Sequence, residues 1–552
     1  MAACPHHSGF FWNDPRFVAD VDSIGVRHSL WVIPGRFRCR ISSLLQDTFH
    51  FTAGASTTVT ATTLLPLPKP VESKQELGQF FTPMPVAEFM ASMFQLLTDE
   101  VQLLDAGAGE GALTEAFVQS ACSRVRRPRR LSVVAYEVDG RVQGALRRTL
   151  DRCKLLCVEQ GIEFEGEIRH ADFIESALGL VREDLFGSAQ SPFNAALLNP
   201  PYRKINSDSQ TRRLLREAGI ETSNLYTGFL ALAARLLCDG GEMVSITPRS
   251  FCNGPYFRPF RREFLGSMSL ERLHVFDSRS AAFQRDSVLQ ENLIVRAVKS
   301  RQHAAEVVIS SSSGATGASI QEMRRPYADV VRPDDAEQFI HIMLDESQAT
   351  ARDRVRRFTS SLSDLGLQVS TGRVVDFRAK DHLRLDSTVG TVPLIYPCHF
   401  EAGFVRWPKS PSKKPNAISD VRDTAELLVS NQTYVLVKRF SAKEERRRVV
   451  ASVFDPSRIA CERVGFENHL NYFHADGAGL EPSLARGLAA YLNSTAVDQY
   501  FRQFNGHTQV NATDLRSLPY PSEAELRRLG SKIADRFPDQ TELDQLLESE
   551  LV

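Results

Sequence analysis

The sequence predicts an α/β protein with a doubly wound, mostly parallel sheet, followed by a second, α+β domain. From about residue 85 to residue 251, short apolar runs of strand length alternate with apolar residues at helical spacing, and this alternation is typical of strand–helix–strand units. Several of the predicted strands end in glycine, acidic or proline-rich turns. Ligands of such folds bind at the carboxyl ends of the strands, so we expect the functional residues at these turns.

The predicted elements follow one another in a regular order. Apolar residues at helical spacing predict the helices, and β-branched or aliphatic runs before turn residues predict the strands. The last helix is expected to stop at a glycine pair. We expect helices at 86–97, 111–122, 139–160 and 224–241, and strands within 101–109, 131–139, 193–202 and 242–251.

The chain length also predicts more than one domain, because 552 residues exceed what a single hydrophobic core usually serves. Residues 1–70 show no sustained periodicity and end in a Thr/Ala/Pro-rich stretch, so we expect an extension of unknown role that is disordered. The alternating pattern assigns 71–330 to a catalytic domain. The more irregular remainder, 331–552, is predicted to be a separate domain.

Composition excludes several classes of protein. The 66 Lys and Arg residues nearly balance the 67 Asp and Glu residues, so global charge does not predict a nucleic-acid binder, and any such binding must be local. No stretch is long and apolar enough to span a membrane, and no signal peptide is present. The nine cysteines form no C-x-x-C pair. We therefore expect a reduced, cytoplasmic protein without a metal site. The sequence does not determine the oligomeric state, and a monomer is the expectation.

Three acidic positions and a glycine turn predict a nucleotide-like cofactor. In DAGAGEG, Asp105 ends a strand, and Gly107 and Gly109 allow the backbone to approach a ligand closely. This turn carries acids instead of the cations that a phosphate prefers. Glu137 at the next strand end suits two ribose hydroxyls, and Asp172 suits an adenine amino group. This ordered set predicts S-adenosylmethionine.

The sequence LLNPPY, residues 197–202, predicts the reacting corner. Here a buried strand runs directly into Asn199, Pro200, Pro201 and Tyr202. The prolines fix the backbone and remove N–H donors, which leaves the Asn199 amide and the Pro200 carbonyl as hydrogen-bond acceptors. Two acceptors that hold the N–H groups of an aromatic amine make its nitrogen lone pair available for attack on a methyl sulfonium. Tyr202 is expected to stack on the base that carries this amine.

These segments resemble the gamma-class N6-adenine DNA methyltransferases of type II restriction–modification systems. The resemblance covers about 75–300 and includes ELGQFFTPMPVAEFMA, DAGAGEGALT, YEVD, ADF and NPPY. It implies that Phe81, Thr82 and Pro83 line the cofactor, together with Asp172 and Phe173. It also implies that a second aromatic ring clamps the flipped base opposite Tyr202. The segment FDSRSAAFQRDSVLQENLIVRA matches the element that carries this ring, which makes Phe283 the predicted clamp.

The resemblance also implies a partner and a role for 331–552. An adenine inside duplex DNA must be flipped out for methylation, and a specific site must be recognised through base edges. VSTGRVVDFR, YVLVKRF and GHTQVNATDLRSLPYP resemble target-recognition segments. The predicted phosphate contacts are Arg373, Arg378, Lys438, Arg439 and Arg446 to Arg448. The implied function is the protection of host DNA, at a short specific site, against a cognate restriction endonuclease.

Three alternatives remain open from the sequence. An NPPY corner also suits RNA and the planar amide of a protein glutamine, and the residues alone do not distinguish adenine N6 from cytosine N4. The chain is alternatively an inactive DNA-binding specificity component. A fused nuclease is not predicted, because no convincing set of paired acids and a lysine is present.

Overall fold

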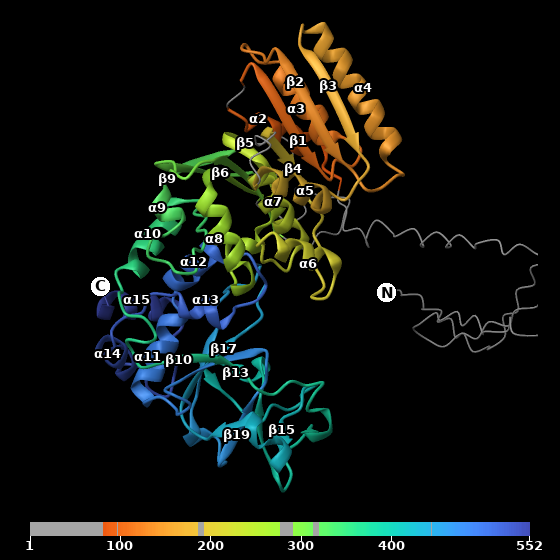
Figure 1. Cartoon of the computed structure of the whole chain (residues 1–552). Helices are drawn as coiled ribbons and strands as arrows, with labels where there is room; N and C mark the ends of the chain where they lie inside the picture. Colours follow the sequence, from red (N-terminus) through yellow and green to blue (C-terminus); the bar gives the residue numbers. More distant parts are fainter. Residues whose placement is uncertain are drawn as a thin grey trace, which may run out of the picture. The chain divides into compact units, whose positions relative to one another are not determined.

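A nine-stranded sheet forms the core of the N-terminal half in this computed structural model (Figure 1). The structure describes residues 81–95, 98–185, 193–276, 291–312, 320–442 and 444–551. The strand order is β3-β2-β1-β4-β5-β7-β6-β8-β9. The strands are β1 (Glu100–Ala106), β2 (Arg130–Tyr136), β3 (Glu163–Arg169), β4 (Phe193–Leu198), β5 (Leu237–Pro248), β6 (Met268–Phe276), β7 (Asn292–Lys299), β8 (Glu306–Ser312) and β9 (Gln321–Pro326).

The sheet is mostly parallel, which confirms the predicted fold class. Strands β3, β2, β1, β4 and β5 pair in parallel, whereas β7 runs antiparallel to both β5 and β6. The carboxyl ends of β1, β2 and β4 therefore meet at one edge. This edge is the place where a doubly wound sheet offers a ligand site.

Helices cover both faces of this sheet, because neighbouring strand residues point to opposite sides. Leu103 belongs to a buried cluster with α2, α3 and α4, whereas Leu104 belongs to a cluster with α5, α7 and α8. This arrangement confirms double winding. The helices are α2 (Met84–Ser92), α3 (Ala112–Cys122), α4 (Gln143–Glu159), α5 (Phe173–Leu185), α6 (Gln210–Glu217), α7 (Leu225–Leu236) and α8 (Arg258–Ser267).

The expected end of the helix at 224–241 is wrong. Helix α7 ends at Leu236, and the next residue, Leu237, is extended with ψ 142° and begins β5. Leu237 is 1% exposed and pairs with Phe193 of β4, so burial of this side chain favours the strand. The glycine pair lies inside β5, where Gly240 has a φ of 78° and the register against β4 shifts. The glycines therefore mark an irregularity in a strand and not a helix stop.

The C-terminal half combines two smaller sheets with a group of helices, an α+β arrangement. The six-stranded sheet has the order β10-β20-β17-β18-β14-β13, and the five-stranded sheet has the order β11-β15-β12-β19-β16. The strands are β10 (Gln368–Thr371), β11 (Leu383–Arg384), β12 (Thr391–Ile395), β13 (Phe400–Glu401), β14 (Phe404–Val405), β15 (Ala417–Ser419), β16 (Leu428–Ser430), β17 (Tyr434–Lys438), β18 (Ala451–Phe454), β19 (Arg463–Phe466) and β20 (Leu470–His474).

Helices pack against the six-stranded sheet and form one buried cluster with it. They are α10 (Glu346–Arg356), α11 (Pro482–Leu492), α12 (Thr495–Phe504), α13 (Ala512–Arg516), α14 (Glu523–Ser531) and α15 (Gln540–Leu551). The short helix α9 (Tyr327–Val330) belongs instead to the buried cluster of the nine-stranded sheet. Of the helices that the structure describes, none is long and apolar enough to cross a membrane.

Buried polar contacts join the segment after β5 to helices α12 and α13. The Arg249 guanidinium donates to the carbonyls of Arg502 and Gln503, at 3.0 and 2.6 Å. The Asn253 amide donates to Asp514 at 3.2 Å. The end of β5, which lies next to the site described below, is thus anchored to the C-terminal half.

Candidate active site

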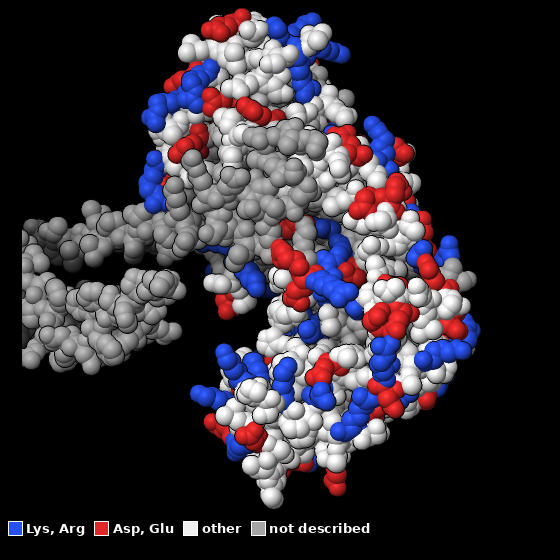
Figure 2. All heavy atoms as spheres, turned by 180° about the vertical axis from the view of Figure 1, so that it is seen from behind, with Lys and Arg blue, Asp and Glu red and all other residues white. Residues whose placement is uncertain are grey.

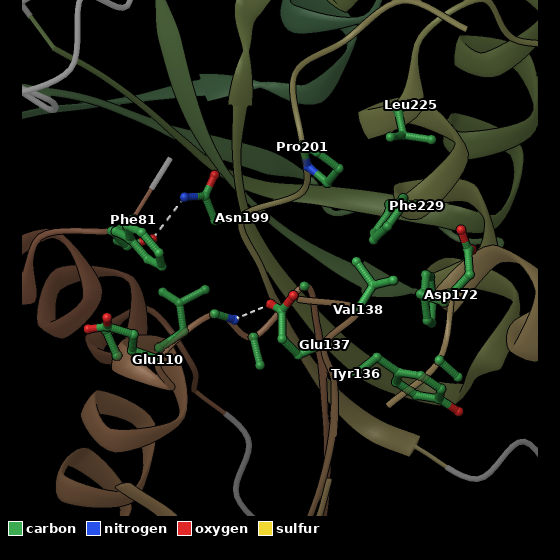
Figure 3. A pocket seen from close by; sticks show the side chains of 18 of the residues that line it. Phe81, Glu110, Tyr136, Glu137, Val138, Asp172, Asn199, Pro201, Leu225 and Phe229 are labelled. Carbon is green, nitrogen blue, oxygen red and sulfur yellow. Dashed lines mark hydrogen bonds between the residues drawn. The ribbon is translucent and has the colours of Figure 1, made fainter. Parts of the chain in front are cut away.

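A pocket lies at the carboxyl edge of β1, β2 and β4 and brings most of the predicted site residues together (Figure 3). The predicted residues that line it are Phe81, Thr82, Gly107, Gly109, Glu137, Asp172, Phe173, Asn199 and Pro201. Pro83, Asp105, Pro200 and Tyr202 are not among the lining residues. Asp105 and Pro200 are buried beside the pocket, and Tyr202 is half-buried.

The glycine turn needs glycines for conformation and for space. Gly107, Gly109 and Gly111 have φ of 83°, 56° and 89°, a region that favours glycine. A Cβ atom on Gly109 would also lie 3.1 Å from the Phe81 ring. The turn is fixed to β2, since the N–H groups of Gly107 and Ala108 donate to the Tyr136 carbonyl at 2.9 and 3.0 Å.

The Glu137 carboxylate is held by two backbone donors. Gly109 N–H donates to Oε2 and Asp139 N–H donates to Oε1, both at 2.7 Å, and Figure 3 shows the side chain turned towards the glycine turn. Burial, opposed by these hydrogen bonds, raises the pKa of the Glu137 carboxyl. Glu137 lines the pocket, so its carboxylate is placed where it can accept hydrogen bonds from a ligand's hydroxyls.

Asp105 is a buried acid with one unsatisfied oxygen. It is 0% exposed, and its Oδ2 accepts a hydrogen bond from the Thr114 hydroxyl at 2.6 Å. Within the described part of the chain, Oδ1 has no partner, which is costly for a buried group. Burial raises the Asp105 pKa to about 7. A cationic group beside this oxygen would satisfy it, and this fits a ligand with an amino-acid portion.

Asp172 stands at an apolar slot on the other side of the pocket. Its Oδ1 accepts a hydrogen bond from the Ile174 N–H at 2.7 Å in the first turn of α5. The rings of Phe173 and Phe229 lie 5.0 Å apart, and Pro201 also lines the slot. These side chains form an apolar wall on which a planar base can pack, and the Asp172 carboxylate beside it is a potential acceptor for amino protons.

The NPPY corner contains a hydrogen-bonded relay that the sequence did not predict. The Asn199 amide Nδ2 donates to the Thr82 hydroxyl at 2.9 Å, and the Tyr202 hydroxyl contacts Asn199 Oδ1 at 2.9 Å. The Tyr202 hydroxyl also lies 3.1 Å from the Ile246 carbonyl of β5. Burial raises the Tyr202 pKa well above its usual value, so the hydroxyl keeps its proton. Thr82 therefore contacts the reacting corner as well as the pocket.

Several pocket residues were missed by sequence reasoning. Val138, Arg203, Thr211, Leu225 and Phe229 line the pocket in addition to the predicted set. Phe229 lies on α7, which is buried almost all round, so apolar periodicity could not show which face meets a ligand. Of these residues, Val138 could have been predicted from the sequence, because it directly follows Glu137.

The predicted clamp and the predicted DNA contacts fare differently. Phe283 lies outside the described residues. Arg373, Arg378 and Arg446 are exposed, while Lys438 and Arg439 are half-buried. Arg448 is wrong as a phosphate contact, because it is 3% exposed and its guanidinium donates internally to Ser441, Asn505 and the His507 carbonyl.

Across the described ranges, no cluster of His, Cys, Asp or Glu could hold a metal ion.

The fold and this pocket define a class, the methyltransferases with a doubly wound sheet. The family model of the Eco57I restriction-modification methylase matches residues 150–283. Type II methyltransferase M.PstI of Providencia stuartii is 43% identical over 87% of this chain and 93% of its own length. Type II methyltransferase M.BsuBI of Bacillus subtilis is 45% identical over 87% and 95%.

The chain therefore belongs to the Type II methyltransferases of restriction–modification systems. Among solved structures, that of the Type IIL restriction-modification enzyme MmeI in complex with DNA has a TM-score of 0.48 and 10% identity, over 82% of this chain and 70% of that one. The predicted recognition as a restriction–modification methyltransferase is thus confirmed.

Proposed function

We propose that this chain methylates N6 of an adenine that is flipped out of duplex DNA at a short specific site. The observation that carries the proposal is the Asn199 corner, which shares one pocket with the glycine turn and with Glu137 and Asp172. Hydrogen-bond acceptors for an amine therefore lie next to a site for a nucleoside-like cofactor. Family membership supports DNA as the substrate and protection of host DNA from a restriction endonuclease as the role.

The residues present fit S-adenosylmethionine, which supplies a methyl group activated on a sulfonium. The unsatisfied Asp105 oxygen suits its ammonium group, Glu137 suits the ribose hydroxyls, and Asp172 suits the adenine amino group. Phe81, Thr82 and Pro83 would cover this ligand, and Phe173 would contact its base. The pocket lining combines apolar side chains with the carboxylates of Glu110, Glu137 and Asp172, which matches a cationic ligand that carries an aromatic base.

In the proposed reaction, Asn199 Oδ1 and the Pro200 carbonyl accept hydrogen bonds from the two N6 protons of the target adenine. These bonds draw the nitrogen lone pair out of conjugation with the ring. Bound S-adenosylmethionine would supply the methyl group to N6 and leave as the thioether, while Asn199 Oδ1 and the Pro200 carbonyl would hold the N6 protons until one of them leaves to solvent. Tyr202 and Phe283 are proposed to stack on the two faces of the base, which repays part of the cost of flipping.

We further propose that Thr82 is a positioning residue. Its hydroxyl accepts the Asn199 Nδ2 proton, which orients the amide so that Oδ1 remains the acceptor. In Figure 3 a dashed line from the Asn199 amide nitrogen, drawn beside Phe81, marks this hydrogen bond. The cofactor-side segment and the reacting corner are thereby linked.

The test offers mixed-sequence duplex DNA, RNA and protein as competing substrates with a labelled methyl donor, followed by nucleoside and amino-acid analysis. We expect the label in N6-methyladenine. Label in N4-methylcytosine would overturn the target assignment, and label transfer only to RNA or to protein glutamine would overturn the substrate. No transfer together with intact DNA binding would indicate an inactive specificity component. Gel filtration tests the proposed monomer, and cell fractionation tests the proposed cytoplasmic location.

A further inference from the structure

A closed loop in the C-terminal half presents three lysines in a fixed arrangement. We call residues 407–416, between β14 and β15, the lysine loop. Its ends are tied by Asn416, which is 3% exposed. Asn416 Nδ2 donates to the Lys409 carbonyl at 3.0 Å, Lys409 N–H donates to Asn416 Oδ1 at 3.1 Å, and the Trp407 indole donates to the Asn416 carbonyl at 2.6 Å. A loop closed in this way loses little entropy when its side chains bind a partner.

The lysine loop is tied to a second basic segment, residues 373–384. Asp376 makes the link, because its carboxylate lies 3.1 Å from Lys414 Nζ and accepts a hydrogen bond from the Tyr396 hydroxyl at 2.7 Å. Together, 373–384 and 406–414 hold eight cations and two acids. The cations are Arg373, Arg378, Lys380, Arg384, Arg406, Lys409, Lys413 and Lys414, and the acids are Asp376 and Asp381.

Most of this charge is not neutralised within the described residues. Arg406 pairs with Glu401 and Lys414 with Asp376, whereas Lys409, Lys413, Arg378 and Lys380 are all exposed. Figure 2 shows Lys and Arg side chains gathered at the end of the molecule that carries β15 and β19 in Figure 1. A surface of this kind attracts an extended polyanion, and attraction of a polyanion does not require a positive net charge.

An exposed aromatic ring stands inside this basic surface. Phe377 is 77% exposed, and the Arg378 guanidinium lies 5.5 Å from its ring centroid. A ring this exposed loses unfavourable contact with water when a partner covers it. Aromatic side chains that flank cations suit nucleic acid, because they pack against bases while the cations contact phosphates.

We propose that the lysine loop binds the phosphate backbone of duplex DNA and that Phe377 packs against the adjacent base steps. A lysine ammonium contacts phosphate as a point charge, so the lysine loop would position the protein on DNA without reading the base sequence. This inference rests on the proposed function, and it adds a binding surface that is distinct from the methyl-transfer pocket.

The experiment measures the salt dependence of DNA binding. The variant carries Lys409→Gln, Lys413→Gln and Lys414→Gln, and the probe is a fluorescein-labelled mixed-sequence duplex titrated at salt concentrations from roughly 50 to 300 mM. Because each phosphate contact contributes about 0.9 to the slope of log K against log salt, we expect the slope to fall by about 2 to 3. The affinity for S-adenosylhomocysteine is expected to stay unchanged.

A matched control exists on the same chain. Arg126, Arg127 and Arg129 are exposed and precede β2, at the amino ends of the strands. The triple variant Arg126→Gln, Arg127→Gln and Arg129→Gln removes the same charge away from the proposed surface, and we expect its slope to match the wild type. An unchanged slope in the lysine variant, or equal losses in both variants, would overturn the inference.

Phe377 is tested separately. Phe377→Ala is expected to weaken duplex binding about tenfold without a change in the salt slope, while Leu385→Ala, at a side chain that is 63% exposed, has no effect. Equal effects of the two substitutions contradict a specific role for the ring. These binding results are independent of methyl transfer, so failure of the proposed function would appear instead as a wild-type protein that binds DNA but yields no N6-methyladenine.

Discussion

The edge of the nine-stranded sheet and the surface around the lysine loop use opposite means of holding a ligand. At the sheet edge, backbone turns place individual oxygen atoms, such as Asn199 Oδ1 and the carboxylate of Glu137, and neighbouring groups fix them by hydrogen bonds of 2.7–2.9 Å. Around the lysine loop, the backbone is fixed but the charges stand on long exposed side chains. The first arrangement suits catalysis, and the second suits binding of a polyanion through charge. Single substitutions should therefore matter much more at the first.

Asn199→Ala should give the largest effect. It removes one preorganised acceptor for the N6 proton, and losses of this kind lower kcat by about 100- to 1000-fold. Cofactor affinity should stay within about twofold, because Asp105, Glu137 and Asp172 remain. Single-turnover methylation and calorimetry with S-adenosylhomocysteine measure the two quantities. A variant that turns over at the wild-type rate would contradict the role given to the NPPY corner.

The ionisation of Asp105 should control cofactor binding through pH. Its pKa of about 7 means that the carboxyl is mostly protonated at about pH 6 and mostly ionised at about pH 8. In the proposed complex an ionised Asp105 holds the ammonium group. We therefore expect the affinity for S-adenosylhomocysteine to rise from about pH 6 to about pH 8, and Asp105→Asn to bind about thirtyfold more weakly only at the higher pH.

Cofactor-free stability should change in the opposite direction. Because folding raises the Asp105 pKa from 3.8 to about 7, the contribution of this group to the free energy of unfolding is present at low pH and is lost as pH rises through about 7. Asp105→Asn should lack this loss, which urea unfolding at about pH 6 and about pH 8 measures. A wild-type cofactor affinity that does not vary across this interval would contradict the proposed contact between the ammonium group and Asp105, which is buried beside the pocket.

Thr82→Val should have a smaller effect at the same edge. The substitution keeps the shape but removes the hydroxyl that accepts the Asn199 Nδ2 proton, and a neutral hydrogen bond is worth about 0.5–1.5 kcal/mol. We therefore expect kcat to fall by about two- to tenfold, and Thr82→Ser to restore it. A loss confined to cofactor affinity, with kcat retained, would show that Thr82 serves only the pocket.

The two regions also differ in how far the sequence predicted them. At the sheet edge, Asp105, Glu137 and Asn199 each stand near the end of a predicted strand, and parallel strands bring their carboxyl ends together. Asp172 follows β3, a strand that the sequence did not predict. Such placement depends on local pattern alone, so the pocket was predictable. The contact between Thr82 and Asn199 was not, because it joins residues 117 positions apart through side-chain packing.

In the C-terminal half, basic residues alone were a poor guide. Arg446 and Arg448 stand two positions apart in one run, yet Arg446 is exposed and Arg448 is buried among carbonyls and amides. Strands here are short, at two to five residues, so periodicity reveals little about which side chains face solvent. The lysine loop was not predicted from the sequence either, because its closure depends on the hydrogen bond from the buried Asn416 amide to the Lys409 carbonyl.

Lys413→Gln should give the smallest effect and so tests the contrast most directly. Lys413 is exposed on the lysine loop, and removal of one phosphate contact should lower the salt slope by about 0.9 and the DNA affinity about threefold at moderate salt. The kcat at saturating DNA should not change, because no atom of the methyl-transfer pocket is altered. A fall in kcat as large as that of Asn199→Ala would mean that the charge of Lys413 takes part in methyl transfer. The pocket at the sheet edge and the lysine loop would then not be functionally separate, and the contrast between them would be wrong.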